Sequence, residues 1–134
     1  MAHADAALLE AITEGATGLL VPSEQDAPLE PLRWVVRGRL TPARLLKRLK
    51  LPPDTPVEVG TLERFFAPIT RVRDAGDAEA VAHAERFAAL HRLLATQLAN
   101  AAVYRVGQVE ITILIIGQAA SGALLGLHTT VVET

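Results

Sequence analysis

The feature that most constrains the fold is a β-branched run at residues 109–116, V-E-I-T-I-L-I-I. Side chains alternate between the two faces of a strand. Every second residue from Val109 to Ile115 is apolar, and the residues between them change from polar at Glu110 to apolar at Ile116. Both faces must then be buried at least in part, which requires helices on both sides of the sheet. We therefore expect an α+β domain, a three-layer α-β-α sandwich around a mostly antiparallel sheet.

Two further strands flank this run at short distances. Residues 103–106 precede it across Gly107-Gln108, which fits a type II′ turn, and residues 123–132 follow it after a turn over 117–122. Short connections favour antiparallel pairing of neighbouring strands. The last third of the chain is therefore predicted to be a three-strand antiparallel meander.

The earlier part of the chain predicts four helices, each beginning at a capping residue. Asp5, Thr41, Thr61 and Asp77 are expected to accept hydrogen bonds from the first free amides of these helices. The segment 21–31 contains three prolines and is predicted to be a stiff, irregular loop. The helices are expected over residues 5–15, 42–50, 61–66 (limited by Pro68) and 77–98, and the strands over 32–37 and 57–59.

Length and composition place the chain among small globular proteins. Its 134 residues suit a single domain over 1–134, and 13 basic against 15 acidic residues argue against broad binding of phosphate backbones. The absence of cysteine excludes a disulfide scaffold, a zinc ribbon and a thiol nucleophile. The longest apolar run is far shorter than the roughly 20 residues of a membrane-spanning helix, and the first ten residues lack a signal-peptide pattern. We expect a cytoplasmic protein without a membrane partner.

Patterns of catalytic chemistry are absent from the sequence. His83 and His91 lie about 12 Å apart at the helical rise and cannot share a metal ion, and His128 is predicted to be an ordinary strand residue. Neither Ser23 nor Ser121 has the G-x-S-x-G context of a nucleophile, and no phosphate-binding glycine loop occurs. The carboxylates form no convincing acid–base pair. We expect no enzymatic activity and no cofactor.

The basic residues between Arg44 and Lys50 lie on one side of the predicted short helix. A solvated helix face is the favoured interpretation, and a patch for an acidic partner is the alternative. Aromatic residues for base stacking are not interleaved with these cations. No nucleic-acid partner is expected from this segment.

Several stretches resemble the nuclease A inhibitor family over nearly the whole chain. The resemblance is strongest from residue 103 onward, through the isoleucine-rich strand to the final V-V-E-T. The stretches that carry it are Gly18-Leu19-Leu20, Ser23-Glu24, residues 53–57, Phe65-Phe66, residues 103–107, Ile116-Gly117, Gly122, Leu124, Gly126-Leu127 and residues 130–134. The family fold is an α-β-α sandwich, in agreement with the two buried faces of the central strand.

The resemblance implies inhibition of a sugar-non-specific, Mg-dependent nuclease of the ββα-metal type, in a 1:1 protein complex. Its inhibitory contacts would include Glu24, the penultimate Glu133 and the terminal Thr134. Mg²⁺ takes hard oxygen ligands at about 2.0–2.1 Å and keeps exchangeable waters. Thr134 offers a carboxylate and a hydroxyl that could replace such waters on the partner's ion, and Glu24 would mimic a phosphate opposite a basic side chain of the nuclease.

Two positions depart from the family pattern. In the loop before the long helix the family has a glutamine and, two positions on, a tryptophan, both of which touch the nuclease; here Arg73 and Ala75 stand there. Two alternatives therefore stay open. One is an interaction or regulatory module of the same fold with a partner that is not a nuclease. The other is an unrecognised enzyme or small-ligand binder.

Overall fold

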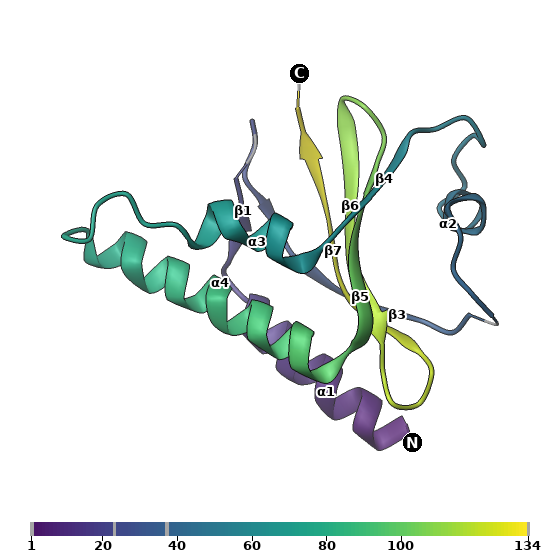
Figure 1. Cartoon of the computed structure of the whole chain (residues 1–134), viewed down its shortest axis with the longest axis horizontal. Coiled ribbons are helices and arrows are strands. Elements are labelled where there is room, and N and C mark those ends of the chain that lie inside the picture. Colours follow the sequence, from purple (N-terminus) through teal and green to yellow (C-terminus); the bar gives the residue numbers. More distant parts are fainter. Residues whose placement is uncertain (1, 23, 37, 134) are drawn as a thin grey trace.

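A five-stranded antiparallel sheet forms the centre of the molecule (Figure 1). This computed structural model describes residues 2–22, 24–36 and 38–133, except the side chains of residues 2 and 3. The strand order is β3-β7-β6-β5-β4, and consecutive strands β5, β6 and β7 form the predicted meander. The strands are β3 (Glu30–Trp34), β4 (Val57–Gly60), β5 (Ala99–Val106), β6 (Glu110–Gln118) and β7 (Leu124–Val132).

In the described part of the chain four helices accompany the sheet, as the sequence predicts. Helices α1, α3 and α4 lie on one side of it and the short α2 lies on the other (Figure 1). The mixed α+β class is thus confirmed. The helices are α1 (Ala2–Ala16), α2 (Pro42–Arg48), α3 (Leu62–Thr70) and α4 (Ala78–Gln97).

Strand β6 has an apolar core on each of its faces. Ile111, Ile113 and Ile115 are buried in the cluster that contains residues of α1, α3 and α4. Leu114, on the other face, is buried in a second cluster with Leu45 of α2. The predicted burial of both faces is therefore confirmed. Each cluster withdraws apolar surface from water, which is the main force that holds the helices on the sheet.

Two glycines let neighbouring backbones approach each other in the sheet. A Cβ at Gly126 would clash with the carbonyl oxygen of Ile115, and one at Gly117 would lie 2.8 Å from Cβ of Leu98. Gly117 was expected in a turn, but it lies within β6, beneath the end of α4. A strand can hold glycine where close packing leaves no room for a side chain.

Three of the four predicted helix caps are confirmed. The side chains of Thr41, Thr61 and Asp77 accept hydrogen bonds from the amides three residues on, at 3.2, 3.1 and 3.1 Å. The predicted cap at Asp5 is wrong, because α1 begins at Ala2 and Asp5 lies inside its first turn.

Asp5 instead joins α1 to the turn between β6 and β7. Its carboxylate is 4% exposed and accepts hydrogen bonds from Oγ of Ser121 to its two oxygens, at 2.8 and 2.7 Å. Arg33 of β3 lies 3.8 Å from it. This tertiary role has no signature in the local sequence of the helix.

Other differences from the expected boundaries have local causes. Helix α3 continues through Pro68 to Thr70, although Pro68 has no amide to donate to the carbonyl four residues earlier. The β5–β6 connection is wider than a two-residue turn, since Val106 pairs with Thr112 and Gly107 donates its amide to the carbonyl of Pro56. The strand expected over 32–37 begins and ends earlier, at Glu30–Trp34.

The proline-containing segment 21–31 is more regular than predicted. Strands β1 (Leu20–Val21) and β2 (Ala27–Pro28) pair in a small separate sheet, here called the β1–β2 hairpin (residues 20–28). Val21 and Ala27 are buried and attach the hairpin to the main core. The hairpin is therefore packed against the rest of the fold.

In residues 2–22, 24–36 and 38–133, no helix has both the length and the apolar character needed to cross a bilayer.

Candidate functional site

The tip of the β1–β2 hairpin contacts the end of the last strand. The amide of Glu24 donates a hydrogen bond to the carbonyl of Val132 at 3.3 Å. Strand β3 pairs with β7 only as far as His128, so the hairpin meets the edge of β7 beyond that point. The Glu24 side chain is exposed. Two segments about 110 positions apart in sequence are thereby held together.

The chain after β7 is held by its backbone and by a side chain. The amide of Glu133 donates to the carbonyl of Val109 at 2.9 Å. Nη2 of Arg105 lies 2.7 Å from Oε2 of Glu133, and the two side chains are 31% and 49% exposed. Residue 133 is therefore fixed in direction as well as position. Thr134, which the family resemblance places at the inhibitory centre, lies outside the described residues, as does Ser23.

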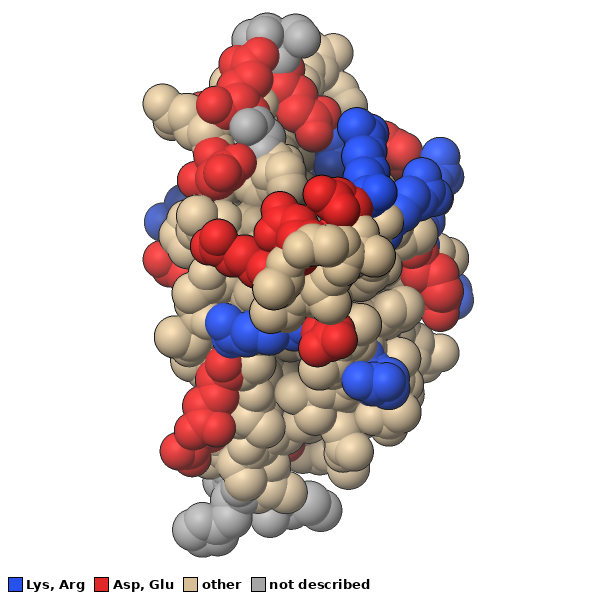
Figure 2. Space-filling view, turned by 90° about the vertical axis from the view of Figure 1, so that its left-hand side faces the viewer, with Lys and Arg blue, Asp and Glu red and all other residues tan. Residues whose placement is uncertain are grey.

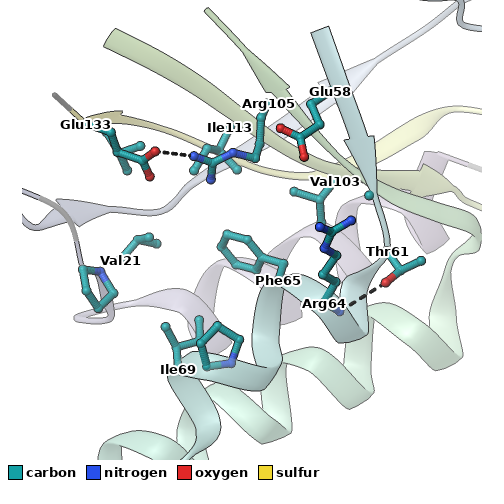
Figure 3. A pocket seen from close by; sticks show the side chains of 14 residues that line it. Val21, Glu58, Thr61, Arg64, Phe65, Ile69, Val103, Arg105, Ile113 and Glu133 are labelled. Carbon is teal, nitrogen blue, oxygen red and sulfur yellow. Dashed lines mark hydrogen bonds and ion pairs between the residues drawn. The ribbon is translucent and has the colours of Figure 1, made fainter. Parts of the chain in front are cut away.

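A cavity of about 320 Å³ opens beside this chain end (Figure 3). Val103, Ile113 and Val131 of the sheet and Phe65 and Ile69 of α3 form its apolar walls, while Glu58, Arg64, Arg105 and Glu133 supply its charges. The figure shows Arg105 pointing from β5 toward Glu133 across the mouth of the cavity. The ion pair is therefore part of the cavity wall and links it to the chain after β7.

The loop between α3 and α4 holds the other two predicted contact residues. Arg73 and Ala75 are exposed, and Asp74 between them accepts hydrogen bonds from the amides of Gly76 (side chain, 2.9 Å) and Asp77 (carbonyl, 3.1 Å). In Figure 1 this loop lies at the far end of α3 and α4 from the sheet. The structure therefore brings Glu24 and Glu133 to one place, with Arg73 and Ala75 at a separate position.

Figure 2 looks onto the end of the molecule where the α3–α4 loop lies. Acidic side chains gather over its upper part, and basic side chains lie toward one side. Glu24, Asp26 and Glu133 are exposed acidic residues of the hairpin and chain end. These three carboxylates bring negative charge to the hairpin and to the chain after β7.

The remaining candidates for chemistry have structural partners. His91 stacks on Phe66 with ring centroids 4.8 Å apart, and His83 meets the ring of Phe87 edge-on at 5.0 Å. Ser121 donates to Asp5, and His128 lines a shallow hollow with Glu30. Within the described ranges, no three histidines or carboxylates are placed to hold a metal ion.

One residue of the candidate site that sequence reasoning missed is Arg105. It lies on the same face of β5 as the buried Val103, since side chains two positions apart share a face. A charged residue on an otherwise apolar face was the available signal. Its partner Glu133 could not be identified, because the pairing spans the whole of β6.

Comparison with known proteins identifies the family of the chain. The family model described as nuclease A inhibitor-like protein matches residues 6–134. No curated protein matches the chain significantly. The match covers the hairpin, the α3–α4 loop and the end of β7 alike.

Proposed function

The chain belongs to the nuclease A inhibitor-like family, and we propose that it inhibits a sugar-non-specific, Mg-dependent nuclease of the ββα-metal type. In this proposal Thr134 and Glu24 enter the partner's active site together. The observation that carries the proposal is the 3.3 Å hydrogen bond from Glu24 to Val132, which holds the acidic hairpin beside the chain end. The protein has no catalytic role of its own and acts in the cytoplasm as a 1:1 complex with the enzyme.

In this proposal, inhibition depends on oxygen atoms that bind the partner's Mg²⁺ and on a chain end that is ordered before binding. A nuclease Mg²⁺ accepts oxygen donors in place of water, and the Thr134 carboxylate and hydroxyl would supply them. Glu24 would pair with a basic side chain that otherwise holds a substrate phosphate. The Arg105–Glu133 pair and the hydrogen bond of the Glu133 amide already fix Glu133, which precedes Thr134. Little conformational entropy of Glu133 would therefore be lost on binding.

Affinity and choice of partner would come from the surrounding surface. A standard protein interface buries about 1,600 Å² in total. The hairpin, the chain end and the α3–α4 loop would together form this contact, with Arg73 and Ala75 at its far side. The proposal requires that Thr134 carry a free carboxylate, which an intact mass measurement of the natural protein checks.

The test is a titration of a ββα-metal nuclease with the protein in the presence of Mg²⁺. Adding one alanine after Thr134, or the change Glu24→Ala, should each weaken inhibition at least tenfold. Glu85→Ala, which removes an exposed carboxylate from α4, is the matched control and should inhibit like the natural chain. Full potency of both test variants would contradict the mechanism.

A second candidate function rests on the α3–α4 loop. Arg73 adds a cation where the family has a neutral glutamine, and Ala75 removes a large aromatic side chain. Both changes suit a regulatory module whose partner is a protein other than a nuclease. Failure of the natural chain to bind any nuclease of the class, with recovery of another protein that contacts Arg73, would favour this alternative.

A further inference from the structure

The near-neutral total charge conceals a strong separation along the chain. Residues 31–53 contain seven of the 13 Lys and Arg residues and none of the 15 Asp and Glu residues. The remaining residues therefore contain six basic and fifteen acidic groups. A separation of this kind is a physical indication of an anionic partner for the basic segment.

The short helix α2, in the middle of this segment, lies on the side of the sheet opposite to α1, α3 and α4 (Figure 1). Helix α2 packs Leu45 and Leu46 against the sheet, which directs its polar side chains outward. Five exposed cations on and around α2 are here called the α2 basic face: Arg39, Arg44, Lys47, Arg48 and Lys50.

The charge of the α2 basic face is not neutralised by acidic neighbours. Among the described residues, none of its five cations forms an ion pair with a carboxylate; the ion pairs there join Arg33 to Asp5 and Arg105 to Glu133. Neutral groups position the arginines instead: Nη1 of Arg44 donates to the carbonyl of Arg39 at 2.7 Å, and the Arg48 guanidinium lies 4.9 Å from the ring centroid of Trp34.

We propose that the α2 basic face binds the sugar-phosphate backbone of duplex nucleic acid, without sequence preference. Phosphate backbones are neutralised by clustered Lys and Arg, and this contact needs no apolar anchor. Stacking on unpaired bases is disfavoured, because the Arg48 guanidinium already lies over the Trp34 ring. An acidic protein is the weaker candidate, because protein interfaces are centred on aromatic and apolar anchors.

This inference is independent of nuclease inhibition, because it uses the opposite side of the sheet from α3 and α4. The near-neutral total charge led us to expect no binding of phosphate backbones. A total charge near zero is nevertheless compatible with one strongly basic surface. Together with the proposed nuclease inhibition, it means that one molecule would bind both the nuclease and the nucleic acid that the nuclease cleaves.

A substitution at Lys50 distinguishes an effect on binding from an effect on stability. Its φ is 59°, a left-handed conformation that glycine adopts at lower cost. The change Lys50→Gly should therefore raise the melting temperature by about 2–5 °C while removing one cation from the face.

The experiment measures fluorescence anisotropy of a labelled 20-base-pair DNA duplex titrated with the full chain. Binding is expected in the micromolar range at low salt and should weaken about 40-fold between 50 and 200 mM NaCl, as for about three phosphate contacts. The double variant Lys47→Glu/Lys50→Glu should lower affinity at least tenfold. The double variant Arg71→Glu/Arg92→Glu changes the net charge equally on other elements and should lower it less than about threefold. Lys50→Gly should lower affinity about two- to fourfold despite its higher melting temperature.

Three results would overturn the proposal. The first is an equal loss of affinity in the two double variants, which would show a general effect of net charge. The second is binding that does not weaken with salt. The third is binding to phosphatidylserine vesicles or to polyglutamate, measured in parallel, without binding to the duplex. None of these results bears on the nuclease titration, so the two proposals fail separately.

Discussion

Arg105 on β5 and Glu133 at the chain end form an ion pair at 2.7 Å that spans the neighbouring strand β6. Both side chains are partly exposed, so the pair contributes about 0–1 kcal/mol to the stability of the fold. Its larger effect is on direction, because it holds the residue next to Thr134. Stability and inhibition should therefore respond differently to its removal.

The change Arg105→Gln tests this difference. The melting temperature should fall by no more than about 3 °C, while the inhibition constant for a ββα-metal nuclease should rise about three- to thirtyfold. Differential scanning calorimetry and a nuclease titration measure the two quantities. A double-mutant cycle with Glu133→Gln should show coupling between the residues, and strictly additive effects on inhibition would contradict a positioning role.

Restoring the family's residues in the α3–α4 loop should strengthen inhibition. The double change Arg73→Gln/Ala75→Trp removes a cation that faces a basic partner and adds an aromatic anchor at an exposed position. An anchor of this kind contributes about 2–4 kcal/mol, which corresponds to about 30- to 1,000-fold in the inhibition constant. Ala88→Trp, on the half-buried side of α4, would instead disturb packing and is not an equivalent control.

A suitable control for that experiment is Ala82→Trp, which adds the same side chain at an exposed position of α4. Inhibition by this variant should equal that of the natural chain. If the restored loop gives no gain over this control, the α3–α4 loop lies outside the nuclease contact.

The contact between β6 and β7 at Gly126 predicts severe destabilisation on substitution. An added Cβ would clash with the carbonyl of Ile115, and the atoms that it would meet are backbone of β6, which has no flexible side chain to move aside. Gly126→Ala should therefore cost about 3 kcal/mol or more, or prevent folding. Urea denaturation followed by circular dichroism measures the loss. Gly60→Ala is the control, because open space surrounds that position.

The link between Asp5 and Ser121 predicts a smaller loss of stability. Ser121→Ala removes the hydroxyl that donates to both oxygens of a carboxylate that is 4% exposed, and Arg33 at 3.8 Å stays as its charged neighbour. The free energy of unfolding should fall by about 1–3 kcal/mol. The double variant Asp5→Ala/Ser121→Ala should cost less than the sum of the two single changes. Additive losses would show that the two residues act independently.

Sequence reasoning succeeded where the cause of a structure is local. The alternation along β6 predicted two buried faces, and Thr41, Thr61 and Asp77 predicted helix starts, because each of these signals involves residues within a few positions. Asp5 and Gly117 were misinterpreted for the opposite reason. Their partners, Ser121 and Leu98, come from other elements, and no local pattern distinguishes such residues from a cap or a turn.

In the candidate site, too, some features could be predicted from the sequence and others could not. The resemblance supplied Glu24, Glu133 and Thr134 as candidates, but not the contact between the hairpin and the last strand. That contact depends on where β3 stops along β7, which is a property of the assembled sheet. The position of Thr134 and the roles of Arg73 and Ala75 stay predictions.

The fixed pairing of β7 has one more consequence. Because the strand pairs with β6 from Leu124 to Val132, the number of its residues sets how far Glu133 lies along the sheet. Deleting a single residue near Thr130 would shorten the reach by about 3.3 Å and would also turn the last side chain to the other face of the sheet. The number of residues in β7 therefore affects the position and the direction of the chain that follows it, whichever residues the strand contains.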